Sequence, residues 1–180
     1  MKTLLSALLV GAAALAAPRA TAQFSFVPYG GYNTEIEGFM VGAGFEYALP
    51  IGESLSLGVR PTAEFHAIDI DEPLLDNFDY YQINADLVGR FTGSEAVAPY
   101  VGLGLALGLV SYEIGEDNRG DTDSSTEVGL NLLGGVEFPG VFRFGAPFAQ
   151  ARYTTVAPEA GDLVTYSSQL SVFGGFRIVF

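Results

Sequence analysis

Apolar and polar residues alternate one by one along most of the chain. Between Phe39 and Leu49 every second residue is apolar or aromatic, and the positions between them include Gly42, Gly44 and Glu46. The alternation is more regular still over residues 55–66, where charged and hydroxyl side chains share one face. A helix would repeat about every 3.6 residues, so a sustained period of two predicts β-strands.

Eight segments with this alternation are the strands that the sequence predicts. They cover residues 24–32, 39–49, 55–66, 81–92, 101–109, 127–138, 147–154 and 169–180. The first segment is ambiguous, because the run from Val27 to Gly31 fits either face of a strand. Beyond residue 17 no stretch approaches the roughly 18 consecutive apolar residues that a membrane helix needs.

Alternation alone does not separate a soluble β-sandwich from a membrane barrel. Most of the segments are long enough for a tilted strand to cross a bilayer, and one face carries nearly all the charges. A soluble sheet would bury its apolar face, whereas a membrane barrel turns that face to lipid. The fold class predicted is therefore all-β, an eight-stranded antiparallel up-and-down transmembrane β-barrel.

The predicted connections fall into two sets. Three are compact turns, at residues 52–54, 93–98 and 139–145. Three are longer and more polar, at residues 69–79, 113–125 and 156–166, while the connection at 33–37 is short. In an outer-membrane barrel the compact turns and both termini face the periplasm, and the other four connections face outward.

The amino terminus has the form of a secretory signal peptide. Lys2 supplies a positive charge, residues 4–17 form an apolar segment, and Ala20-Thr21-Ala22 fits a cleavage site. We expect a cleaved signal peptide over residues 1–22 and a single barrel domain over residues 23–180. A retained anchor is the alternative, but the apolar segment is short for a membrane span.

Composition narrows the classes of function. The mean hydropathy is +0.31. The chain has no cysteine, which excludes disulfides, thiolate–zinc sites and lipoprotein anchoring. Removing residues 1–22 takes away Lys2 and Arg19, leaving six basic and 21 acidic side chains and a net charge of −15. A surface this acidic repels nucleic acid, so we expect no nucleic-acid partner.

Most of the acidic residues fall in or beside the predicted outer connections. The segment 116–123 has spaced carboxylates of the kind that Ca²⁺ favours, although it lacks the EF-hand pattern, and a solvated acidic loop is the simpler interpretation. Divalent cations bridging these acids to lipopolysaccharide phosphates are a further hypothesis. No dedicated metal site and no cofactor are predicted.

The strand faces that point inward carry balanced charges. The predicted lumen charge network contains Glu46, Arg60, Glu64, His66, Asp86, Arg90, Glu137, Arg152 and Arg177. An eight-stranded barrel is only wide enough for its own side chains, so these buried charges are expected to pair. We predict a Glu46–Arg60–Asp86 ladder that closes the lumen, with inward glycines leaving room for it. Charges solvated by lumen water are the alternative.

Several segments carry a family resemblance: PYVGLGLALGLVSY (99–112), GLNLLGGVEF (129–138), PFAQARY (147–153) and FGGFRIVF (173–180). They resemble the small outer-membrane β-barrels of OmpA/OmpX type over essentially all of residues 23–180. The resemblance implies that Phe176, Ile178 and Phe180 form the C-terminal signal read by the barrel-assembly machinery. It also implies a place in the cell outer membrane, but such barrels include structural proteins, adhesins, channels and a few lipid-modifying enzymes.

His66 is the only histidine, and it shares the inward face of its strand with Glu64. A Glu–His pair can serve an acyl-transfer triad when a serine nucleophile is near. In the outer-membrane lipid A deacylases that serine follows the histidine on the same strand, and here the corresponding position is Ile68. No catalytic residue is therefore predicted, and His66 is interpreted as a hydrogen-bonding residue of the lumen.

The function predicted is a structural or surface-interaction role for an outer-membrane barrel with a closed, charge-paired lumen and acidic outer loops. It is not expected to be an enzyme. A narrow porin-like channel for small solutes is the alternative, and a lipid-modifying enzyme is the weaker one. The expected partners are outer-membrane lipid, lipopolysaccharide and the barrel-assembly machinery, and the chain is expected to be a monomer.

Overall fold

The structure is a computed structural model that describes residues 22–67, 75–94, 96–114, 121–155, 159–160, 164–165 and 168–180. The strands are β1 (Gln23–Asn33), β2 (Gly38–Pro50), β3 (Leu55–Ala67), β4 (Leu75–Phe91), β5 (Ala98–Ile114), β6 (Asp121–Glu137), β7 (Gly145–Thr154), β8 (Glu159–Ala160), β9 (Val164–Thr165) and β10 (Gln169–Val179). Within these residues, no helix is both long and apolar enough to cross a membrane.

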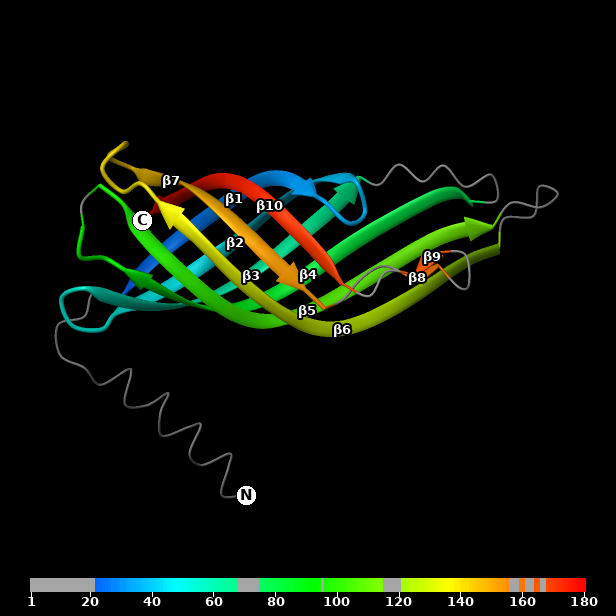
Figure 1. Ribbon diagram of the computed structural model, residues 1–180, viewed down its shortest axis with the longest axis horizontal. Coiled ribbons are helices and arrows are strands. Elements are labelled where there is room, and N and C mark those ends of the chain that lie inside the picture. Colours follow the sequence, from blue (N-terminus) through cyan, green and yellow to red (C-terminus); the bar gives the residue numbers. More distant parts are fainter. Residues whose placement is uncertain are drawn as a thin grey trace, which may run out of the picture.

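Eight of the strands form one closed antiparallel barrel, as the sequence predicted (Figure 1). Each strand pairs with its neighbour in the chain, and β1 closes the ring by pairing with β10. The closing ladder runs from Ser25 opposite Val179 to Asn33 opposite Ser171. Closure leaves no open sheet edge around the body of the barrel. The remaining two strands, β8 and β9, form a separate two-stranded sheet.

The two faces of each barrel strand differ as the alternation predicted. Outward positions carry exposed apolar side chains, such as Phe39, Val59 and Leu103, and the charged residues of the predicted lumen network are buried inside. The ambiguous first strand is resolved by its register, since Val27 and Tyr29 are buried among lumen side chains. The interior is therefore polar and partly aromatic, and the apolar surface is on the outside.

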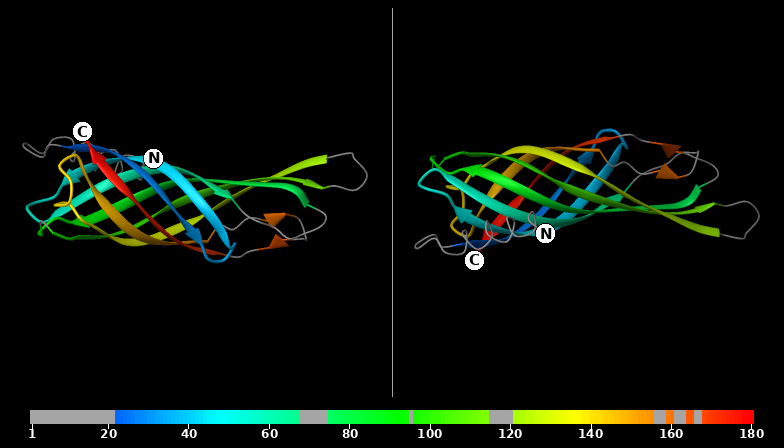
Figure 2. Two further views of the ribbon diagram at one scale, coloured as in Figure 1. Left: turned by 90° about the horizontal axis from the view of Figure 1, so that it is seen from above. Right: turned by 90° about the horizontal axis from the view of Figure 1, so that it is seen from below.

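The barrel has two unlike ends. The C-terminus and the compact turns after β2, β4 and β6 lie at one end, which we call the turn end (Figure 1). The backbone amide of Phe180 donates to the carbonyl of Phe24 at 3.0 Å, which fixes the C-terminus to the start of β1. The opposite end, the loop end, carries the turn after β1 and the short strands β8 and β9 (Figure 2).

The strands β4, β5 and β6 are each 17 residues long and project beyond the others at the loop end (Figures 1 and 2). The three-stranded extension, which we define as residues 75–79, 111–114 and 121–124, lies beyond the ladders to β3 and β7. The predicted bounds of the loops at 69–79 and 113–125 are therefore wrong, because residues 75–79, 113–114 and 121–125 belong to strands. Polar residues do not end these strands, because Ser and Thr pair well in β-ladders. The predicted loop at 156–166 contains β8 and β9.

Candidate functional site: the charged interior

All nine residues of the predicted lumen network lie buried inside the barrel, and their acidic and basic members balance at four each, counting His66 as neutral. The alternation on each strand places them there, since every second side chain points inward. They do not form one continuous ladder. Their ion pairs divide them into two clusters along the barrel axis.

The turn-end cluster consists of Glu46, Arg60, Arg90, Glu137 and Arg177. Arg60 and Arg90 lie 2.7 and 2.6 Å from the carboxylate of Glu46. Arg90 and Arg177 lie 3.0 and 2.5 Å from the carboxylate of Glu137. Cations and anions therefore alternate across five strands, and each glutamate is shared by two guanidinium groups.

An aromatic ring supports this cluster. The Tyr100 ring lies 5.4 Å from the Arg60 guanidinium carbon and 5.7 Å from that of Arg90. The Tyr100 hydroxyl donates to Gln150 Oε1 at 3.0 Å, and Arg60 donates to the same oxygen at 3.0 Å. The ring and the amide therefore hold Arg60 and Arg90 in place beside Glu46.

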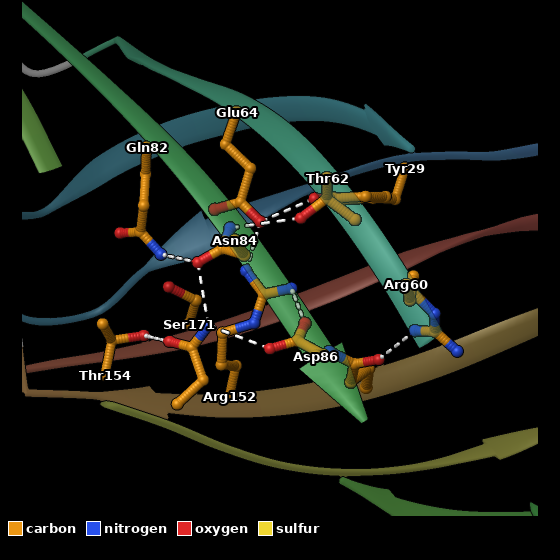
Figure 3. A network of polar contacts seen from close by, with 12 residues as sticks. Tyr29, Arg60, Thr62, Glu64, Gln82, Asn84, Asp86, Arg152, Thr154 and Ser171 are labelled. Atoms are coloured by element: carbon orange, nitrogen blue, oxygen red, sulfur yellow. Dashed lines mark hydrogen bonds and ion pairs between the residues drawn. The ribbon is translucent and has the colours of Figure 1, made fainter. Parts of the chain in front are cut away.

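The central cluster consists of Arg152, Glu64 and Asp86 (Figure 3). Arg152 on β7 pairs with Glu64 on β3, and its other terminal nitrogen lies 3.5 Å from Asp86 on β4. The Tyr29 hydroxyl donates to Glu64 at 2.6 Å, and the Arg152 guanidinium lies 5.1 Å from the Phe173 ring. One arginine therefore serves two carboxylates across the lumen.

The predicted Glu46–Arg60–Asp86 ladder is present only in its first half. Arg60 and Asp86 are directly opposite on β3 and β4. The Arg60 side chain nevertheless points to Glu46 and Gln150, while Asp86 binds Arg152 and accepts from Asn131 at 3.0 Å. The extension of the ladder to Asp86 is wrong, because a long side chain from across the lumen reaches Asp86 instead.

Amide side chains fill the lumen between the central cluster and the loop end. Gln82 donates to Asn84 at 2.6 Å, and Asn131 donates to the same Asn84 oxygen at 2.8 Å. Gln169 donates to both Gln82 and the Tyr80 hydroxyl at 2.8 Å. These residues come from β4, β6 and β10, so the network joins opposite walls of the barrel.

His66 is buried beside this amide layer. Its ring packs on Tyr80, with 4.7 Å between ring centroids, and its Nε2 lies 3.4 Å from Glu64 Oε2. Neither ring nitrogen has a partner of good hydrogen-bond geometry among the described residues, and Glu64 is the nearest candidate, so the interpretation of His66 as a hydrogen-bonding residue stays a prediction. The carboxylate of Glu64 is already held by Arg152 and Tyr29. Ile68, the position compared with a deacylase serine, lies outside the described residues.

Inward glycines make room for these side chains, as predicted. A Cβ atom on Gly42 would lie 2.7 Å from the Tyr29 ring and 2.9 Å from Glu64 Cγ. A Cβ atom on Gly104 would overlap the Asp86 carboxylate and the Ala85 carbonyl. Both glycines therefore allow close packing around the central cluster.

Three tyrosines that the sequence did not predict in the interior, Tyr29, Tyr80 and Tyr100, also belong to it. All three are buried, and their hydroxyls bind polar lumen residues. The inward parity of Tyr80 and Tyr100 was available from the neighbouring positions of their strands.

The residues of the predicted C-terminal signal lie on the outside at the turn end. Phe180 is 77% exposed, and its ring lies 6.2 Å from that of Phe24. Phe176 contacts the rings of Phe142 and Phe144, which belong to the turn between β6 and β7. The strand β10 ends at Val179 and includes Ile178.

The proposed cation-binding segment is only partly described. Residues 115–120 lie outside the described residues, and residues 121–123 belong to β6 rather than to a loop. In the described part of the chain, no group of three or more His, Asp or Glu side chains is placed to hold a metal ion.

Residues 3–176 match the family model described as the outer membrane protein beta-barrel domain. No curated protein sequence matches the chain. The chain is similar in structure to Neisserial surface protein A, with 21% identity and a TM-score of 0.63 over 88% of this chain and 96% of that one.

Two further solved barrels share the fold. Ail, the attachment invasion locus protein of Yersinia pestis, is 13% identical with a TM-score of 0.60, over 88% of this chain and 99% of that one. The N-terminal β-barrel domain of Pseudomonas aeruginosa OprF is 12% identical with a TM-score of 0.61, over 90% of this chain and 100% of that one. At these identities the likeness establishes the fold and not a shared activity.

Proposed function

Because the chain belongs to the outer membrane protein β-barrel family, we propose that it is a non-enzymatic outer-membrane barrel with a closed lumen and a role at the cell surface. The cell outer membrane is its location. The turn end then faces the periplasm and the loop end faces outward, since barrels of this type have short periplasmic turns and longer outer loops. The proposal has two parts, the lumen and the surface.

The observation that carries the closed lumen is the pairing of all four interior carboxylates with arginines that arise on other strands. Side chains that bridge opposite walls leave a solute no straight path. Opening one would require several buried charges to separate at once, and each separation is strongly unfavourable.

Solute entry into liposomes tests the closed lumen. Proteoliposomes that contain the full chain should take up small sugars no faster than protein-free liposomes, as followed by swelling. Rapid swelling that increases with the amount of folded protein would instead support the narrow channel. A heat-denatured sample supplies the control for leakage caused by inserted, unfolded protein.

The surface role rests on the three-stranded extension and on the acidic charge of the outer half. The extension raises a sheet beyond the membrane-embedded part of the barrel. Ail has been crystallised in complex with the heparin analogue sucrose octasulfate. A chain with a net charge of −13 repels such a polyanion, so we propose that the partners of this surface are neutral, cationic or bridged by cations.

Divalent cations are the simplest bridge between these acids and the phosphates of lipopolysaccharide. Adding EDTA to the protein in lipopolysaccharide-containing vesicles should lower its thermal unfolding temperature. The same addition in phospholipid vesicles that lack lipopolysaccharide should have no effect. An unchanged unfolding temperature in both would contradict cation bridging.

The lipid-modifying alternative has little support in the geometry. The His66 ring is buried, and its carboxylate neighbour Glu64 is occupied by Arg152 and Tyr29. A general base must reach the proton that it removes. The mass spectrum of lipid A should therefore be the same with and without the gene.

We further propose that residues 1–22 are removed on export and that the folded barrel is a monomer. The first barrel strand begins at Gln23, directly after the expected cleavage site. The intact mass of protein from outer membranes should equal that of residues 23–180. A single monomeric mass by light scattering in detergent, after correction for the micelle, would support the monomer.

A further inference from the structure

A cavity of about 180 Å³ lies at the turn end of the barrel. A single water needs roughly 10–15 Å³ by a comparable measure, so the cavity holds a small solute together with water. Its walls include the side chains of Arg90 and Arg177, which belong to the turn-end cluster. Ser56, Thr92 and Gln23 add hydroxyl and amide groups around them.

No acidic side chain lines this cavity among the described residues. The nearest carboxylates of the turn-end cluster already accept hydrogen bonds from arginines. Both oxygens of Glu46 accept from Arg60 or Arg90. Both oxygens of Glu137 accept from Arg177.

The turn-end cluster contains three arginines and two glutamates and therefore has one excess positive charge. A guanidinium group carries five N–H donors, more than these contacts use. Arg90 Nε lies 3.0 Å from Glu137, and the two terminal nitrogens of Arg90 each donate one hydrogen to Glu46, so the second hydrogen of each terminal nitrogen is left over. Buried donors and an uncompensated positive charge next to a cavity favour an anion there.

We propose that the cavity is a binding site for a small oxyanion, a phosphate or carboxylate group that enters from the periplasm. The guanidinium groups of Arg90 and Arg177 supply the charge and paired N–H donors that match two oxygens of such a group. The hydroxyls of Ser56 and Thr92 supply further donors. The site shares Arg90 and Arg177 with the turn-end cluster and opens toward the turn end, and its periplasmic side rests on the proposed orientation of the barrel.

Isothermal titration of the purified full chain in a nonionic detergent tests the site. Sodium phosphate and sodium acetate are titrated in separate experiments, each against sodium chloride at equal ionic strength, because salt screens charges without regard to shape. Saturable binding of phosphate alone assigns a phosphate, binding of acetate alone assigns a carboxylate, and binding of both supports the oxyanion class. Saturable binding of neither would overturn the proposal.

A charge variant links the binding to this cavity. Thr92 is exposed at the rim, so Thr92→Glu adds a carboxylate to the cavity lining that includes Arg90 and replaces no member of the buried pairs. It should weaken anion binding about tenfold or more, as expected when charge-assisted hydrogen bonds are lost. The matched variant Thr34→Glu adds the same charge in an exposed turn at the loop end and should bind as the unmodified chain does. Equal affinities in all three proteins, or equal weakening in both variants, would place the anion elsewhere and overturn the proposal.

Discussion

At the scale of single residues, the interior depends on carboxylates that are shared between arginines. Glu46 serves Arg60 and Arg90, and Glu137 serves Arg90 and Arg177. A buried ion pair adds little net stability when it forms, but removing one partner leaves a buried charge without compensation. Each shared carboxylate is therefore a point at which one substitution affects two cations.

Glu46→Gln should lower the free energy of unfolding by about 3–5 kcal/mol, because two guanidinium groups lose their anion together. Guanidinium chloride unfolding from lipid vesicles gives this value. The matched variant Glu53→Gln, in the exposed turn after β2, should change the free energy by less than about 0.5 kcal/mol. Similar small changes in both variants would show that the ion pairs are not buried as described.

Gly42→Ala should destabilise the barrel by about 1–3 kcal/mol through overpacking. The added Cβ atom would press on Tyr29 and Glu64, the hydrogen-bonded pair of the central cluster. Gly89→Ala is the control, since the nearest atom to its Cβ would lie 3.9 Å away. The same unfolding measurement compares the two, and a loss at Gly89 as large as that at Gly42 would argue against the packing.

At the scale of elements, the sequence was informative wherever a strand has one face in lipid and one in the lumen. The alternation in residues 55–66 and 81–92 predicted the inward side of β3 and β4 correctly. The alternation does not predict the strands of the three-stranded extension, because both faces of a strand outside the membrane tolerate polar residues. The ends of β4, β5 and β6 depend on pairing between strands, which single-segment patterns do not contain.

The extension should be separable from the barrel. Replacing residues 112–123 by Asn-Gly joins Ser111 to Ser124, which are paired across the ladder, through a favourable two-residue turn. The shortened chain should still fold, because the remaining pairs of β5 with β4 and β6 are unchanged. Heat-modifiable migration on gels measures folding. Failure of the shortened chain to fold would mean that the extension nucleates the barrel.

Phe180→Ala should reduce the amount of protein in the outer membrane and leave folding into vesicles nearly unchanged. The side chain is mostly exposed, so little packing is lost, while the family resemblance gives this residue a role in assembly. Phe91→Ala removes another exposed aromatic ring at the same end, at the last residue of β4, and is the matched control. Equal loss of both variants from the outer membrane would assign the effect to membrane contact rather than to recognition.

At the scale of the whole molecule, the sequence predicted which charged residues line the interior, but it did not predict which of them form ion pairs with each other. Strand parity placed all nine charge-network residues inside. The partners of Arg152 come from β3 and β4, on strands that do not neighbour β7. Contacts across a lumen depend on the shear and diameter of the closed barrel. A prediction based on neighbouring strands alone therefore gave Asp86 the wrong partner, Arg60.

The whole interior is neutral, yet its charges are unevenly distributed. The turn-end cluster has one excess positive charge, and the central cluster has one arginine for two carboxylates. Among the described lumen residues, the excess of positive charge therefore lies toward the turn end and the excess of negative charge toward the loop end, which agrees with an anion site at the turn end.

Single-channel recording in planar lipid bilayers tests the closed, charge-paired lumen most directly. The purified full chain, once inserted, should give no steady conductance above that of bilayers that receive detergent alone. The ion pairs that cross the lumen predict this result, because ions would have to pass between buried, occupied charges. A steady, large conductance from the unmodified, folded barrel would contradict the closed lumen.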